Sequence, residues 1–210
     1  MADDDNNMSE SEVEKMMHEA SHDETPAGGA VVFVGEMIKI TLIALAIILP
    51  VRYFLIKPFY VNGASMEPSY FNKEYLIIDE ITYRFNAPER GDVVVFRYPE
   101  DHTQFFIKRI IGLPGERVVI KDGVITIYNS TKPEGGLINE PYLSPDAYTA
   151  GDTDITLDED EYYVLGDNRS ASLDSRRFGP LTFEEIIGKT WLRGWPPDRV
   201  GVISEPIFDL

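Results

Sequence analysis

The stretch Phe105-Phe106-Ile107-Lys108-Arg109-Ile110-Ile111-Gly112 places a lysine within an apolar run that is typical of a β-strand. If the strand alternates, Phe106, Lys108 and Ile110 share one face and the intervening residues share the other. A buried charge is costly, so the alternative is an exposed face with Lys108 at the edge of a sheet. Burial lowers a lysine pKa by up to about 3–5 units. Apolar surroundings are therefore what a lysine needs to act as a base.

Short apolar runs rich in Val, Ile, Phe and Tyr lie on both sides of this stretch and predict further strands. Asp122-Gly123 predicts a two-residue hairpin turn, and Thr182-x-x-Glu185 predicts one short capped helix. Residues 129–160 are rich in Pro, Gly and Asp and predict a long surface excursion. We expect the unit from 58 to 205 to be mainly β and antiparallel. The expected strands are Tyr75–Ile81, Asp92–Tyr98, Phe105–Ile111, Arg117–Ile120, Val124–Tyr128, Tyr162–Leu165, Thr190–Trp195 and Val200–Ile203.

A second stretch, Asn62-Gly63-Ala64-Ser65-Met66-Glu67-Pro68, offers a serine on a turn marked by Gly and Pro. A serine hydroxyl becomes a nucleophile when a neighbouring base removes its proton. Histidine is a poor candidate for that base, because His102 lies in Pro99-Glu100-Asp101-His102-Thr103, which is typical of an exposed hairpin tip. The alternative is an ordinary turn serine. We hypothesise that Ser65 and Lys108 meet in the fold and form a serine–lysine protease dyad.

Residues 31–57 form the candidate membrane segment. Ile40–Val51 carries no charge, and Arg52 is the only charge between Lys39 and Lys57. A transmembrane helix needs about 20 apolar residues. A buried core helix is disfavoured because the run is apolar all round, and a cleaved signal peptide is disfavoured by the late start and acidic upstream flank. We expect one transmembrane helix.

The charges around this segment conflict with the orientation we expect. The upstream flank is acidic, whereas Arg52 and Lys57 follow the apolar run, so the positive-inside rule favours an exported N-terminus. Residues 1–30 hold nine acids and one lysine and predict a disordered acidic tail. Ser9-x-x-Glu12 resembles a capping box, so the tail forms either a marginal solvated helix or a short partner-binding one.

Composition restricts the chemistry further. The 210-residue chain has no cysteine, which excludes a thiol nucleophile, disulfides and zinc–thiolate sites. Its formal net charge of −17 argues against a nucleic-acid partner. The sequence contains no P-loop and no GxGxxG motif, and its three histidines form no pattern typical of a metal site. We expect no metal and no cofactor.

A third polar stretch, Gly166-Asp167-Asn168-Arg169-Ser170-Ala171-Ser172-Leu173-Asp174-Ser175-Arg176, follows an expected strand. Alone, it is typical of a surface loop with local ion pairs. Together with the Ser-Met-x-Pro around Ser65 and the stretches Arg90–Phe96, Lys108–Glu116 and Asn139–Leu143, it resembles bacterial type I signal peptidase over about residues 50–195. The resemblance implies a membrane-bound serine endopeptidase that removes signal peptides from exported proteins, with a mainly β catalytic domain.

The resemblance also implies roles for the residues that match the family's motifs. Ser65 is the expected nucleophile and Lys108 the neutral general base, with Ser172 orienting the lysine through a hydrogen bond. The backbone N–H of Ser65 is expected to donate to the oxyanion. Some family members add a hydroxyl donor from a serine at the position of Gly63, so a main-chain N–H or a water would supply the second donor here.

Two supporting ion pairs are implied, Arg109 with Asp167 and Asp174 with Arg176. The substrate is expected to bind extended, with small side chains at the first and third positions before the cut. The expected partners are signal peptides, membrane lipid and the translocation machinery. The family places its catalytic domain outside the cytoplasmic membrane, and we follow the family over the flanking charges. The residues expected to face the substrate or the membrane are Met66, Phe59 and Tyr60.

The apolar approach to Ser65 is expected to form a surface at the bilayer interface; the alternative is that it joins the core. Its residues are Val51, Tyr53, Phe54, Leu55, Ile56, Phe59, Tyr60 and Val61. Two other functions compete with signal peptidase. An SOS-repressor-type autoprotease predicts a DNA-binding helix-turn-helix, which the acidic N-terminus does not offer. A membrane-anchored β scaffold without catalysis is disfavoured because Ser65, Lys108 and Ser172 are all present.

Overall fold

The computed structural model describes residues 11, 14–15, 26–50, 56–204, 206 and 208. The chain divides into two compact units, Met1–Leu49 and Pro50–Leu210. Most of the expected acidic tail lies outside the described residues, as do residues 51–55 of the expected apolar approach. The expectations for those segments stay predictions.

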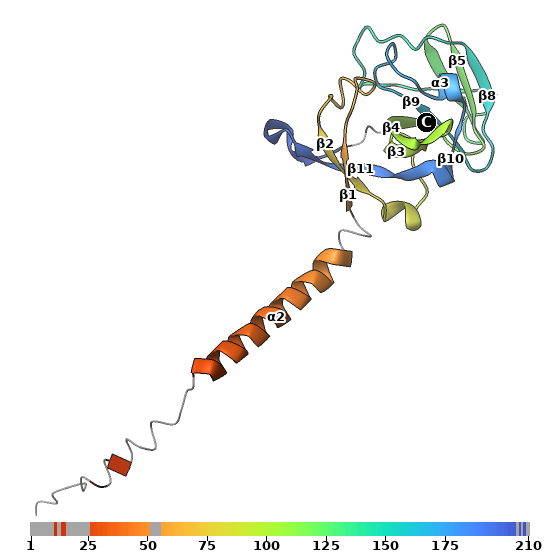
Figure 1. Cartoon of the computed structure of the whole chain (residues 1–210). Helices are drawn as coiled ribbons and strands as arrows, with labels where there is room; N and C mark the ends of the chain where they lie inside the picture. The colour runs from red at the N-terminus through yellow and green to blue at the C-terminus, as the bar shows by residue number, and fades with distance from the viewer. Residues whose placement is uncertain are drawn as a thin grey trace, which may run out of the picture. The chain divides into compact units, whose positions relative to one another are not determined.

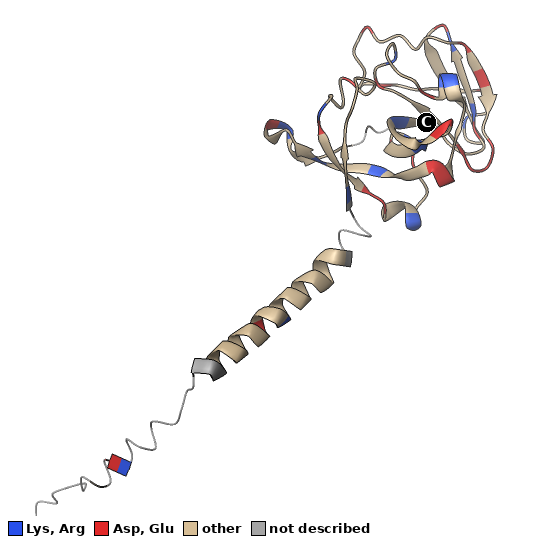
Figure 2. Ribbon diagram, in the orientation of Figure 1, with Lys and Arg blue, Asp and Glu red and all other residues tan. Residues whose placement is uncertain are grey.

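In the part of the first unit that the structure describes, one long helix, α2, spans Pro26–Pro50 and so ends at the first residue of the second unit. At 1.5 Å per residue, its 25 residues reach about 37 Å, enough for a hydrocarbon core of about 30 Å. The stretch Gly29–Leu49 is long and apolar enough to cross a membrane, and none of it is buried. Figure 2 shows α2 almost without charged residues. The exposure argues against a core helix, because a core helix would bury these side chains.

The helix ends earlier than the sequence analysis expects. Ile56 and Lys57, included there in the membrane segment, begin strand β1, which spans Ile56–Tyr60. They pair with Asp79 and Ile78 of the next strand. This pairing satisfies their backbone groups within a sheet, so both residues belong to the β unit.

The second unit is built on an eight-stranded antiparallel sheet with the order β1-β2-β11-β3-β4-β9-β10, and β12 pairs with β11. The expected strands of this region are confirmed, with shifted ends. Strands far apart in the sequence become neighbours, as Figure 1 shows for β2 and β11. The strands after β1 are β2 Tyr75–Asp79, β3 Val93–Tyr98, β4 Asp101–Gly112, β9 Glu161–Leu165, β10 Leu181–Thr182, β11 Ile186–Trp195 and β12 Gly201–Val202.

A smaller four-stranded sheet has the order β7-β6-β5-β8. Its β5 and β8 lie on the opposite side of the β unit from β1 and β2 (Figure 1). Asp122 and Gly123 have φ values of 50° and 83°, which confirms the predicted hairpin turn between β5 and β6. Residues 129–160 are more ordered than expected, because they contribute β7 and β8. The strands are β5 Arg117–Lys121, β6 Val124–Tyr128, β7 Gly136–Leu137 and β8 Thr153–Thr156.

The helices of the β unit are short. The 3₁₀ turn η3, Phe183–Glu185, carries the predicted capping box between Thr182 and Glu185. The helix α3 spans Ser175–Phe178, and Asp174 is its N-cap, with a side chain that accepts a hydrogen bond from the Arg176 N–H. Two further 3₁₀ turns are η2 Thr82–Arg84 and η4 Pro197–Arg199.

Strand β3 is buried on both faces and separates two parts of the core. Val93 and Val95 pack on one side, whereas Val94 and Phe96 pack on the other. The first side also holds Met66, which is 1% exposed, and Val61, which is 5% exposed. The expectation that Met66 faces the substrate or membrane is therefore wrong, as is the membrane-facing placement of Val61, because both side chains fill this core. A third part joins the two sheets through Ile111, Val118, Ile120, Ile125, Ile127, Leu157, Tyr163 and Leu165.

Candidate active site

Ser65 lies on a turn that follows β1 and is fixed by local hydrogen bonds. Gly63 adopts a φ of 111°, which favours glycine because a Cβ would be strained there. The Gly63 N–H donates to Asn72 Oδ1 at 3.1 Å, and the Glu67 N–H donates to the Ala64 carbonyl at 3.2 Å. These contacts hold the serine at the edge of a cavity.

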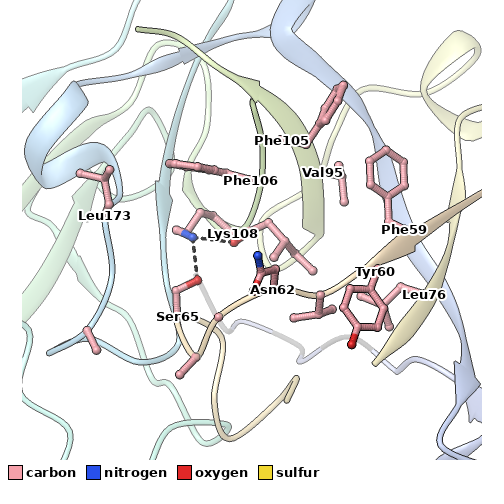
Figure 3. A pocket seen from close by; sticks show the side chains of 15 residues that line it. Phe59, Tyr60, Asn62, Ser65, Leu76, Val95, Phe105, Phe106, Lys108 and Leu173 are labelled. Carbon is pink, nitrogen blue, oxygen red and sulfur yellow. Dashed lines mark hydrogen bonds between the residues drawn. The ribbon is translucent and has the colours of Figure 1, made fainter. Parts of the chain in front are cut away.

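Strand β4 brings Lys108 to this turn. Its backbone pairs with Val94 in the buried strand β3. Lys108 Nζ lies 2.8 Å from Ser65 Oγ, and the same nitrogen donates to the Ile107 carbonyl at 2.8 Å. Figure 3 shows the two side chains pointing toward one another, with Phe106 beside the lysine. The two side chains therefore meet in the fold, at the hydrogen-bond distance that a nucleophile and its base require.

The lysine is buried, with 3% of the residue exposed. Desolvation lowers the pKa of its amine from 10.5 to about 8, although Asp174 and Asp167 act in the opposite direction. At pH 7, about one such lysine in ten is neutral. A neutral amine has a lone pair that can accept the proton of the Ser65 hydroxyl.

Ser172 does not make the expected hydrogen bond to Lys108. Its hydroxyl is buried and has no hydrogen-bond partner of normal geometry among the residues that the structure describes. The side chain lies instead against Gly166, where an added Cβ would stand 2.1 Å from Ser172 Oγ and 2.5 Å from the Ser65 carbonyl oxygen. Gly166 is thus a position where only glycine lets the loop approach the nucleophile turn.

The expected ion pair between Arg109 and Asp167 is present and buried, with 4% and 2% of the residues exposed. The guanidinium donates to both carboxylate oxygens, at 2.9 and 2.6 Å. The adjacent Asn168 donates its backbone N–H to the Ser65 carbonyl at 3.0 Å and its side-chain amide to the Ala64 carbonyl at 3.1 Å. The pair therefore anchors the loop whose Asn168 is hydrogen-bonded to the nucleophile turn.

The expected pair between Asp174 and Arg176 is also present. Both carboxylate oxygens accept from the guanidinium at 2.8 Å, and Asp174 accepts the Gly166 N–H at 3.1 Å. Burial raises the pKa of Asp174, but the hydrogen bonds and charge of Arg176 outweigh it and hold the pKa below its ordinary value. The carboxylate is thus charged at neutral pH and fixes the other end of the loop.

A cavity of about 460 Å³ opens beside the two reactive side chains. Phe59 and Tyr60, which are expected to face the substrate or the membrane, both line it (Figure 3). The Ser65 N–H makes no hydrogen bond with another described group, so it is available to an oxyanion. The Gly63 N–H is already used by Asn72. Most of the lining is apolar: Val61, Leu76, Val95, Phe105, Phe106, Ile107 and Leu173.

Two features, the position of His102 and the arrangement of the acidic side chains, bear on a histidine base and on a metal site. His102 lies in β4 just after the hairpin tip, with 64% of its side chain exposed and Glu185 at 3.9 Å. Within the described ranges, no group of three or more His, Asp or Glu side chains is arranged to hold a metal ion.

Residues 34–195 match the family described as signal peptidase, peptidase S26. The chain belongs to this family. It is 36% identical over 177 residues to the probable signal peptidase I-2 of Synechocystis sp. (strain ATCC 27184 / PCC 6803 / Kazusa), covering 81% of this chain and 77% of the relative. It is 35% identical over 175 residues to signal peptidase I P of Bacillus subtilis subsp. natto, covering 79% and 91%. It is 36% identical over 179 residues to signal peptidase I of Leptolyngbya laminosa, covering 81% and 84%.

Three groups in this chain of the signal peptidase family have contacts that its sequence does not indicate. They are the Ile107 carbonyl, which holds the lysine, Gly166, which permits the close loop, and Asn168, which grips the nucleophile turn. A backbone carbonyl carries no residue signature. Gly166 and Asn168 stand inside the quoted polar stretch, but their contacts depend on loops that meet only in the folded chain.

Proposed function

We propose that Ser65 is the nucleophile and Lys108 the general base with which this chain removes signal peptides. The chain is a signal-peptide-cleaving serine endopeptidase of the peptidase S26 family. The observation that carries the assignment of roles is the 2.8 Å contact between Lys108 Nζ and Ser65 Oγ. The lysine pKa of about 8 supports it, because a base must be partly neutral at working pH.

The proposed reaction has two stages. Neutral Lys108 accepts the Ser65 proton while Ser65 Oγ attacks the carbonyl carbon of the scissile peptide, and the oxyanion accepts a hydrogen bond from the Ser65 N–H. The lysine ammonium then protonates the leaving amine, so the mature protein departs and an ester links Ser65 to the signal peptide. Lys108 next deprotonates a water, which attacks the ester. Ser65 recovers its proton from the lysine as the signal peptide leaves with a new carboxylate.

The residues before the cut would lie in the cavity beside the dyad. Its lining is apolar, and Figure 3 shows Leu173 at one end and Phe59 with Phe105 at the other. An extended strand bound here presents alternate side chains to the wall, which suits small side chains at the first and third positions before the cut.

The proposed location is a membrane anchored by α2, with the β unit on the extracytoplasmic side. The family is membrane-anchored, and α2 has the required length and composition. Aromatic side chains at the paired ends of β1, β2 and β11 support contact with lipid, because amphipathic rings favour the interface. Tyr60, Tyr75 and Trp195 are 49%, 49% and 52% exposed. The translocation machinery is a further proposed partner, since the substrate emerges from it.

Topology is tested by protease accessibility on intact protoplasts. Digestion of the β unit from outside is expected, and a protected β unit with a digestible N-terminus would reverse the proposed orientation. As a control, the same membranes are digested with and without detergent. Digestion of the β unit in detergent would show that the protease can cleave it when no membrane protects it.

Catalysis is tested by purifying the full chain in detergent and measuring its cleavage of a preprotein. This substrate has small residues at the first and third positions before the cut. Ser65→Ala is expected to abolish cleavage and labelling by a serine-reactive acylating probe. Ser130→Ala, an exposed serine after β6, is the matched control and should behave as the parent chain does. Equal cleavage by Ser65→Ala would overturn the assignment of the nucleophile, and no cleavage by the parent chain would favour the inactive scaffold.

A further inference from the structure

A second cavity, of about 490 Å³, is lined by residues that adjoin the nucleophile turn in sequence and by the loop that carries Asn168. From the nucleophile turn, the first cavity takes residues up to Ser65 and the second takes Glu67 and Pro68. From the loop, the first takes Ala171 and Leu173 and the second takes residues 167–170. The two linings share no residue. The turn that carries Ser65 and the loop that carries Asn168 each contribute residues to both cavities, so the second lining continues along the chain from the first. The remaining polar lining of the second cavity includes Asp146, Tyr148, Asn168 and Ser170.

The path of a bound substrate connects these cavities. Attack at the scissile carbonyl places the cut bond at Ser65 Oγ, with the residues before it in the first cavity. An extended chain advances about 3.3 Å per residue. Glu67 is two residues from Ser65, at most about 7.6 Å along consecutive Cα atoms. The second and third residues after the cut therefore come within reach of the second cavity.

The charges in the second cavity are uneven. Asp167 is paired with Arg109, and Arg169 is paired with Glu140. Glu67 and Asp146 make neither an ion pair nor a side-chain hydrogen bond with any residue in the described part of the chain. Because both pairs are internally neutral, two carboxylates face the cavity without a partner.

An exposed aromatic ring lies in the same cavity. Tyr148 is 59% exposed, and its ring lies against Gly123, where an added Cβ would stand 2.4 Å from Tyr148 Cε2. A cation attracted by the carboxylates can also lie over the open face of this ring. A basic side chain thus finds two kinds of favourable contact, whereas an acidic side chain meets two like charges.

We propose that this second cavity is a subsite for the first residues of the mature protein, and that Glu67 and Asp146 make it prefer a basic side chain there. The proposal rests on the proposed function, since it takes the cut to occur at Ser65. The occupant of the second cavity is the segment immediately after the cut. The first cavity binds the residues before the cut and therefore does not select this segment. Two unpaired carboxylates beside the reaction centre then act as specificity determinants for the mature sequence.

The test uses the full chain in detergent and signal-peptide substrates that are identical before the cut. Each carries Lys, Gln or Glu at one of the first four positions after it, and kcat/KM is measured for each. Exposed charge pairs are individually weak, so attraction of Lys and repulsion of Glu together predict a preference for Lys of about fivefold. The preference should be largest at the second or third position and should shrink at high salt.

The variant Glu67→Gln/Asp146→Asn is expected to bring the Lys-to-Glu ratio to about one by weakening cleavage of the Lys substrate and improving that of the Glu substrate. The matched control, Glu159→Gln/Asp152→Asn, removes the same charge from exposed positions that do not line this cavity and should keep the parent ratio.

Three results would overturn the inference. The first is equal cleavage of all the substrates by the parent chain. The second is loss of the ratio in the control variant, which would indicate a general charge effect. The third is a parallel fall for Lys and Glu substrates in Glu67→Gln/Asp146→Asn, which would indicate damage to the nucleophile turn. A parent chain that cleaves none of the substrates would instead refute the proposed function, and the inference with it.

Discussion

Lys108 Nζ and Ser65 Oγ lie 2.8 Å apart, although 43 residues separate them in the chain. The serine stands on a turn after β1 and the lysine on β4, and these strands are not neighbours in the sheet. The Ile107 carbonyl provides a second fixed partner for the same nitrogen. One amine is therefore held within reach of the hydroxyl that it is proposed to deprotonate.

The pH dependence of cleavage should report the lysine. Because burial lowers the pKa of Lys108 to about 8, kcat/KM should rise with pH and level off above about 8 as the amine becomes neutral. Lys108→Arg should be inactive, since guanidinium stays protonated. His102→Ala should retain the parent profile, because His102 is exposed and distant from the dyad. An unchanged profile in Lys108→Arg, or lost activity in His102→Ala, would show that another group is the base.

Removal of the buried amine should stabilise the β unit below pH 8. The pKa of Lys108 falls from 10.5 to about 8 on folding, a cost of about 3 kcal/mol to the folded state when the amine is charged. Lys108→Met keeps an unbranched chain of similar length but leaves Ser65 Oγ and the Ile107 carbonyl without this partner, at about 1 kcal/mol each. The net gain expected at pH 6–7 is about 1–2 kcal/mol.

This gain should disappear as the pH rises from about 8 to 10.5, because the unfolded lysine then holds a proton that the folded lysine has lost. Denaturant unfolding followed by tryptophan fluorescence measures it, since both tryptophans, Trp191 and Trp195, lie in β11. A constant difference between parent and variant across this range would contradict the lowered pKa.

The two carboxylate–arginine pairs Asp167–Arg109 and Asp154–Arg117 provide a matched comparison. Each joins an arginine to both oxygens of an aspartate, but the first is buried and the second exposed. Asp167→Asn strands a buried guanidinium, which typically costs about 3–5 kcal/mol. Asp154→Asn should change stability little, because solvent screens its partner.

Asp167→Asn should also reduce cleavage, since Arg109 would no longer anchor the loop that carries Asn168. Urea unfolding and kcat/KM are measured on both variants. Equal losses of stability in the two variants would contradict the role given to burial.

Gly166→Ala should damage the site, because its Cβ would stand 2.5 Å from the Ser65 carbonyl oxygen. Either the loop at position 166 or the nucleophile turn must then move. Because the clashing Ser65 atom belongs to the backbone, this movement displaces the nucleophile, and kcat should fall at least about tenfold. Gly201→Ala is the control, since a Cβ there meets nothing within 4 Å. Steady-state kinetics and a thermal melt separate lost activity from lost folding. Normal kcat in Gly166→Ala would mean that the loop has room for a methyl group.

The amino-acid sequence alone predicts the mainly β architecture, most strands, the Asp122-Gly123 hairpin and the Thr182–Glu185 capping box, because these depend on local alternation and turn chemistry. It also points to Ser65 and Lys108, through the resemblance of their motifs to those of type I signal peptidase. These features need only the residues themselves and their neighbours in the chain.

Tertiary structure decided the remaining features. Met66 follows the nucleophile in sequence, yet the turn directs its side chain into the core, where it is 1% exposed. Ser172 stands beside Gly166 rather than hydrogen-bonding to Lys108, because loop and turn approach more closely than sequence spacing can indicate. Whether a side chain is buried, paired or free depends on long-range packing. That packing lowers the pKa of Lys108, and it leaves Glu67 at the edge of a second cavity.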